Sequence, residues 1–110
     1  MSQRTLKVER LIQQTVASHL VGLLPKPLAP TVTVTAVEVS PDLRQATVWV
    51  GVLAEADRAQ QILKELNTVK PELQRAVAAT MSTKYVPRLH LRLDTGGAYA
   101  QEIDSLIKKL

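Results

Sequence analysis

The sequence contains no cysteine and no phenylalanine, and its only aromatic residues are one tryptophan and two tyrosines. The lack of cysteine excludes a disulfide framework, thiolate catalysis and a zinc site with sulfur ligands. No apolar run approaches the ~18 residues of a membrane-spanning helix, and none of signal-peptide type follows the charged N-terminus. We therefore expect a cytoplasmic protein without a membrane partner.

The 110 residues suit one domain, 1–110, with a single core. Hydrophobic residues make up 45% of the chain but aromatic residues only 3%, so the core must consist of valine, leucine, isoleucine and alanine. An aliphatic core of this kind is typical of helices packed on a sheet.

The basic surplus is local. The net charge is +4, and the window from Leu73 to Leu93 contains four lysine or arginine residues and no acidic residue. Such a patch favours a polyanionic partner such as nucleic acid, and the alternative is a merely solvated basic face. A second basic edge, spaced by three residues on the first helix, is either a further contact or a solubility feature; it consists of Arg4, Lys7 and Arg10.

Hydrophobic periodicity predicts a helix over 5–24, which three prolines then end. Residues 31–40 alternate as a strand, but the valines change parity in mid-run, which predicts a β-bulge near Thr35–Ala36. Ser40-Pro41-Asp42-Leu43 supplies turn residues, and the run 46–52 alternates cleanly as the second strand of a hairpin.

The second half of the chain predicts two helices, 56–66 and 72–84, that meet at a bend near Pro71. VPRLHLRLD then reads as a strand with leucines on one face and Arg88, His90 and Arg92 on the other. Gly96-Gly97 precede a last helix over about 98–110.

Three strings in this order resemble the ribosome-binding factor A family: RTLKVERLIQQTV, VSPDLRQATVWVGVL and YVPRLHLRLDTGGAYAQEIDSLI. The resemblance implies an α+β, KH-like domain of type II topology (α-β-β-α-kink-α-β) with a C-terminal helix on a three-stranded sheet. It also implies a non-enzymatic assembly factor that binds the free small ribosomal subunit and assists late maturation of its rRNA, including the 5′ end.

The chain departs from the family pattern at three places. The kink carries Val69-Lys70-Pro71 where the family usually has Ala-x-Gly, Leu91 stands where the family has phenylalanine, and Pro27-Leu28-Ala29-Pro30 replaces an acidic loop. These departures bear on the kink and the loop more than on the fold.

We expect the RNA-binding surface to follow the bend and the third strand. Its candidate residues are Lys70, Arg75, Lys84, Arg88, His90 and Arg92, with Arg4, Lys7 and Arg10 as the second edge. Trp49 is predicted on the same face as the arginine row, where it either stacks on an unpaired base or packs beneath the Tyr99, Ile103 and Leu106 stripe of the last helix.

The sequence offers little for catalysis. His19 lies on the apolar face of its helix, His90 has no carboxylate at a useful offset, and no metal-ligand cluster or cofactor motif occurs. Asp94 or Thr95 is interpreted as a helix cap.

One alternative is an enzyme of the acylphosphatase kind. Such an enzyme would need a phosphate-binding loop and an N-terminal strand, whereas the chain opens with a helix. A generic KH-like RNA-binding module or a protein-interaction module stays open as the alternative function. We expect a monomer with no small-molecule substrate.

Overall fold

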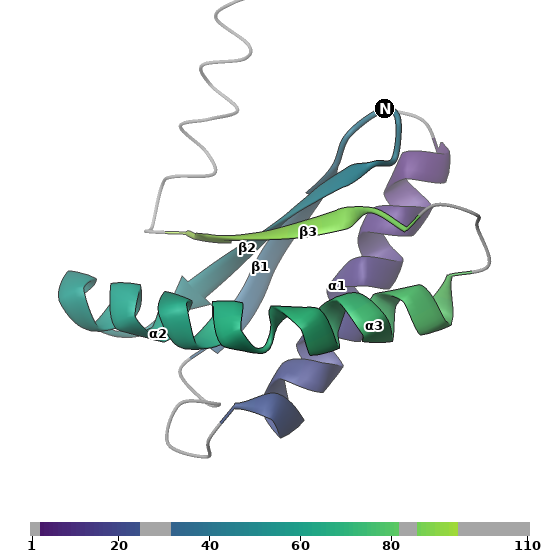
Figure 1. Ribbon diagram of the computed structural model, residues 1–110. Coiled ribbons are helices and arrows are strands. Elements are labelled where there is room, and N and C mark those ends of the chain that lie inside the picture. Colours follow the sequence, from purple (N-terminus) through teal and green to yellow (C-terminus); the bar gives the residue numbers. More distant parts are fainter. Residues whose placement is uncertain (1–2, 25–31, 82–85, 95–110) are drawn as a thin grey trace, which may run out of the picture.

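The part of the chain that the structure describes has the predicted order of elements, α-β-β-α-α-β (Figure 1). It is a computed structural model that describes residues 3–24, 32–81 and 86–94. The elements are α1 (Gln3–Leu23), β1 (Val32–Val39), β2 (Gln45–Val52), α2 (Ala56–Thr68), α3 (Lys70–Thr80) and β3 (Arg88–Leu93). The predicted α+β, KH-like class is confirmed, and the helix expected over 98–110 lies outside the described residues.

β1 and β2 form an antiparallel hairpin whose register shifts at the predicted bulge. Val34 pairs with Val50, and the next pair along is Ala36 with Trp49, so Thr35 is the inserted residue. An inserted residue restores the alternation that the sequence breaks. The valines before and after Thr35 therefore face the same core.

β3 lies beside β2 and runs parallel to it, which gives the sheet order β1-β2-β3. Parallel neighbours need a crossover connection, and α2 with α3 supplies it. The register places Leu89 beside Ala46 and Leu91 beside Val48. All four side chains are buried, so the leucine face of β3 is the core face, as predicted.

The Ser40–Leu43 turn closes the hairpin, with the Leu43 amide donating to the Ser40 carbonyl at 2.8 Å. The Asp42 carboxylate accepts from the Ser40 hydroxyl at 2.6 Å and from the Arg44 amide at 3.1 Å. These two bonds, aided by the charge of Arg44, lower the pKa of Asp42. Leu43 has φ 61° and packs partly against the core. That left-handed backbone costs a non-glycine residue about 1 kcal/mol, which the turn contacts offset.

α2 ends and α3 begins at Val69, which confirms the predicted bend. The amides of Glu72 and Leu73 both donate to the Val69 carbonyl at 3.1 Å. Pro71 occupies the first turn of α3, where a helix has no partner for an amide hydrogen. The proline therefore starts a helix instead of interrupting one.

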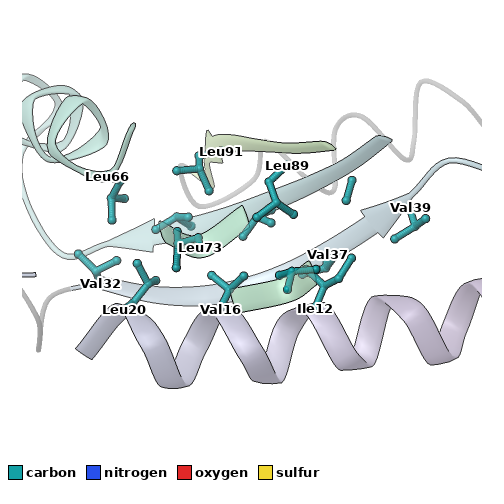
Figure 2. Close-up of a cluster of buried hydrophobic side chains, with 14 of the residues drawn as sticks. Ile12, Val16, Leu20, Val32, Val37, Val39, Leu66, Leu73, Leu89 and Leu91 are labelled. Atoms are coloured by element: carbon teal, nitrogen blue, oxygen red, sulfur yellow. The ribbon is translucent and has the colours of Figure 1, made fainter. Parts of the chain in front are cut away.

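The helices bury one face of the sheet (Figure 2). In Figure 2, Ile12, Val16 and Leu20 of α1 point toward β1, and Leu66 and Leu73 lie on the opposite side of the same cluster. Each of these five side chains is at most 4% exposed. Full burial of one such side chain contributes about 1.5–3 kcal/mol, so the aliphatic core carries the fold as the composition predicts.

The side chain of Gln74 in α3 covers the outer edge of β3. Its Nε2 donates to the Pro87 carbonyl at 2.8 Å, and its Oε1 accepts from the Leu89 amide at 3.0 Å. One side-chain amide thus makes the two bonds that a further strand would make, on either side of Arg88. It satisfies backbone groups that would otherwise be unpaired at an edge and ties α3 to the start of β3.

Replacing Gln74 with alanine should lower the free energy of unfolding by about 1–3 kcal/mol, because the part-buried Leu89 amide and Pro87 carbonyl each lose their partner. Urea denaturation measures this change, and hydrogen exchange should show lost protection of the Leu89 amide. Gln60→Ala, the same substitution at an exposed position of α2, is the matched control. Equal stability of the two variants would contradict the role of Gln74.

The Asp42 turn predicts a pH dependence. Because the folded-state pKa lies below the ordinary value of 3.8, Asp42 stabilises the folded protein above that pH and stops doing so as the pH falls through the folded-state pKa. The stability difference between the protein and Asp42→Asn should therefore be largest near about pH 6 and shrink toward about pH 3. Urea titrations across this range measure it, with Glu65→Gln on α2 as the control. A difference that is constant with pH would rule out the contribution.

Candidate nucleic-acid interface

The charged row of β3 lies on the sheet face turned away from the core, as predicted. Arg88, His90 and Arg92 are exposed, whereas the leucines between them are buried. The helices that the structure describes pack on the opposite face (Figure 1). Strand alternation therefore directs three side chains of one strand outward, spaced two residues apart.

Trp49 lies on the same face as this row, but the residue is only 3% exposed. The guanidinium carbon of Arg92 lies 5.1 Å from the ring centroid, and the indole Nε1 donates to Glu38 Oε1 at 3.3 Å. The burial of Trp49 and the guanidinium over its ring leave little of the ring accessible in this conformation, and stacking on a base stays a prediction. The ring holds Arg92 by a cation–π contact. Packing beneath Tyr99, Ile103 and Leu106 lies outside the described residues.

Arg44 lies beside the start of this row, although the sequence analysis did not include it. The Arg88 amide donates to the Arg44 carbonyl at 2.8 Å, and both side chains are exposed. Beside them, a ring nitrogen of His90, Nε2, lies 2.6 Å from Gln45 Oε1. The parallel pairing of β2 with β3 makes these residues neighbours. A signal existed in the basic residue just before the second strand, but only the strand register gives it a place.

The candidate cations near the bend between α2 and α3 are less accessible than predicted. Arg75 is exposed, but its Nη2 lies 3.5 Å from Glu72 Oε1, an acid just outside the basic window. Lys70 is half-buried, and Lys84 lies outside the described residues. Because Gln74 binds the backbone on either side of Arg88, α3 brings Arg75 toward the same edge of the sheet.

The second basic edge is on α1. Arg4, Lys7 and Arg10 are all exposed. Glu9 turns the other way, and its Oε2 accepts from the Val39 amide at 2.9 Å. The structure thus separates the acid of α1 from its cations and places these on a different element from the β3 row.

His19, expected to be a hydrogen-bonded residue of the core or its boundary, is exposed, and its Nδ1 lies 2.8 Å from the Thr15 carbonyl. Residues 3–24, 32–81 and 86–94 contain no group of three metal-binding side chains. None of their helices has the length and apolar character to cross a membrane.

Comparisons with known proteins match this architecture to one family. The family model of ribosome-binding factor A matches residues 4–107. The ribosome-binding factor A of Rhodopirellula baltica is 33% identical over 109 residues, covering 99% of this chain and 80% of the relative.

Solved structures agree in fold. A solution structure of a Thermotoga maritima protein, a candidate ribosome-binding factor A, has a TM-score of 0.74 and 26% identity, covering 87% of this chain and 92% of that one. A model of the Thermus thermophilus factor, fitted into a map of its complex with the 30S subunit, has a TM-score of 0.60 at 22% identity and covers 84% and 93% of the two chains. With its family model matched over almost its whole length, the chain belongs to the ribosome-binding factor A family.

Proposed function

We propose that this protein binds the free small ribosomal subunit in the cytoplasm and assists late maturation of its rRNA, including the 5′ end, by RNA binding without catalysis. Family membership supports the ribosome as the partner. The Thermus thermophilus relative fitted into a 30S complex supports the small subunit. The observation that carries the RNA contact is the row of exposed cations on β3, with Arg88 and Arg92 on one face of the strand and exposed Arg44 beside its start.

The cationic row of β3 is better suited to binding phosphate groups than to binding bases. Guanidinium groups offer planar pairs of N–H donors that match phosphate oxygens. Trp49 fixes Arg92 from below, which lowers the entropy that Arg92 loses on binding an anion. His90, beside Gln45, can add a hydrogen bond to a base or sugar. Arg75 and Lys70 of α3 extend the proposed surface beyond the strand, and Lys84 stays a candidate from the sequence that lies outside the described residues.

Contacts of this kind position rRNA without reading its sequence. A rigid sheet edge that binds several phosphates favours the RNA conformation whose backbone follows it, and disfavours the others by the same free energy. Steering of rRNA folding therefore needs no reacting group, only differential binding of its conformations.

Co-sedimentation with purified small subunits, large subunits and assembled ribosomes tests the partner. We expect pelleting with free small subunits that is selective and weakens as salt is raised, because phosphate contacts release counterions. Arg75→Glu with Arg88→Glu should abolish pelleting while far-UV circular dichroism stays unchanged. Arg58→Glu with Lys64→Glu, two equal charge reversals on exposed positions of α2, is the control pair.

Equal pelleting with every particle would reduce the function to a generic basic RNA-binding module. The cationic row of β3 would be excluded as the RNA-binding surface by either of two results. One is full pelleting of the variant with Arg75→Glu and Arg88→Glu, and the other is an equal loss of pelleting in the α2 control variant.

A single-stranded RNA oligonucleotide measures the number of contacts. About four phosphate contacts give a log–log salt slope of about −3. Replacing Arg44 and Arg88 with alanine should bring the slope to about −1.5, because each of the two lost phosphate contacts contributes about −0.7 to the slope on a single strand. An unchanged slope in this variant, as measured by fluorescence anisotropy at several salt concentrations, would exclude both arginines.

A further inference from the structure

The middle residue of the outward β3 row is a histidine, and its side chain has a defined partner. Nε2 of His90 lies 2.6 Å from Oε1 of Gln45, at the start of the neighbouring strand β2. A carboxamide oxygen has no hydrogen to donate, so Nε2 must carry the hydrogen of this bond. When the imidazole is neutral, its other nitrogen, Nδ1, is therefore a hydrogen-bond acceptor.

This acceptor lies in a row whose other members are donors. Arg88 and Arg92 stand two residues to either side of His90, and Arg44 lies beside the start of the strand. A guanidinium group has five N–H donors and no acceptor. His90 is exposed, and within the residues that the structure describes its ring makes one hydrogen bond, through Nε2. Nδ1 is thus available to a ligand that brings a hydrogen.

A phosphate group of RNA cannot use this acceptor. Its oxygens accept hydrogen bonds and carry no hydrogen, so they bind the arginines but not the lone pair of Nδ1. The 2′-hydroxyl of ribose does have a hydrogen to donate, and every nucleotide of RNA has one. Each ribose also joins two phosphates, so a hydroxyl lies between two anions along the strand, as His90 lies between two cations along β3.

We propose that Nδ1 of His90 accepts a hydrogen bond from a ribose 2′-hydroxyl and thereby selects RNA over DNA at the β3 row, with Gln45 as the positioning residue that fixes the ring. This inference rests on the proposed binding of rRNA by that row. Bases also carry N–H donors, but the place of these donors changes with the base, whereas a hydroxyl recurs beside each phosphate. The arginines supply affinity, and His90 supplies the choice of sugar.

The tautomer of His90 is measured directly by NMR of the ¹⁵N-labelled full chain at about pH 8, at which free imidazole is neutral. We expect the spectrum of an imidazole with its hydrogen on Nε2 and none on Nδ1. Gln45→Leu removes the acceptor that selects this tautomer, so it should shift the ring nitrogens of His90 and leave those of His19, on α1, unchanged. A hydrogen on Nδ1 of His90 in the unaltered protein would overturn the proposal.

The choice of sugar is measured by fluorescence anisotropy at the same pH. The probes are a single-stranded RNA of about ten nucleotides and the same sequence with fluorine in place of each 2′-hydroxyl. Fluorine removes the donor hydrogen and leaves the phosphates in place. One hydrogen bond of ordinary strength gives the RNA about a three- to tenfold preference. Two base sequences are compared, so that a preference set by the bases is separated from one set by the sugar.

Three variants separate affinity from the choice of sugar. His90→Lys leaves only donors in the row, so the preference for RNA should disappear while both probes bind at least as tightly. Arg88→Ala should do the reverse, weakening both probes equally and keeping the preference. His19→Lys, the same substitution at an exposed histidine of α1, is the matched control and should change neither. Far-UV circular dichroism verifies that each variant folds.

Equal binding of the two probes by the unaltered protein would overturn the role of His90 and leave phosphate binding by the row intact. The same conclusion would follow from a preference that His90→Lys retains, or from one that changes with the base sequence. No binding of either probe would overturn the RNA contact of the row together with this inference. The failure of the sugar contact is therefore distinguishable from the failure of the RNA-binding surface.

Discussion

The one-sided burial of a three-stranded sheet is the constraint on which the rest of this structure depends. α1 and the α2–α3 pair all pack on the face that carries Leu89 and Leu91, so every second residue of β2 and β3 is directed away from the core. The outward set includes Arg88, His90 and Arg92 because strand side chains alternate with period two. Fold stability and the cationic edge thus come from the same six residues of β3, and a shift of register would destroy both.

Trp49 shows how the outward face is organised. Its indole Nε1 donates to Glu38 on β1, and the guanidinium of Arg92 on β3 lies over its ring. One side chain of β2 therefore contacts a charged side chain on each of its two neighbouring strands. The ring supports Arg92 on the face turned away from the core.

Local rules were enough to predict most of the fold. The parity change among the valines located the bulge at Thr35, and Pro71 located the bend, because each follows from a few adjacent residues. Alternation gives the sheet face on which Trp49 lies but not its exposure, so the sequence left stacking on a base and packing beneath another element as alternatives; the structure buries the residue. The contact of the Arg88 amide with the Arg44 carbonyl, 44 positions away in the sequence, depends on the parallel register of β2 with β3, which no short-range pattern encodes. The Glu72 partner of Arg75 was within reach of the i,i+3 rule.

The two sets of cations that the sequence offers differ in what surrounds them. On β3, His90 lies beside Gln45 and Arg92 lies over the Trp49 ring, so these cations belong to a polar sheet face. The exposed cations of α1 belong to the other side of the molecule, because α1 packs on the core face of the sheet. The sheet therefore separates the two basic sets, and only the β3 set shares its face with Trp49.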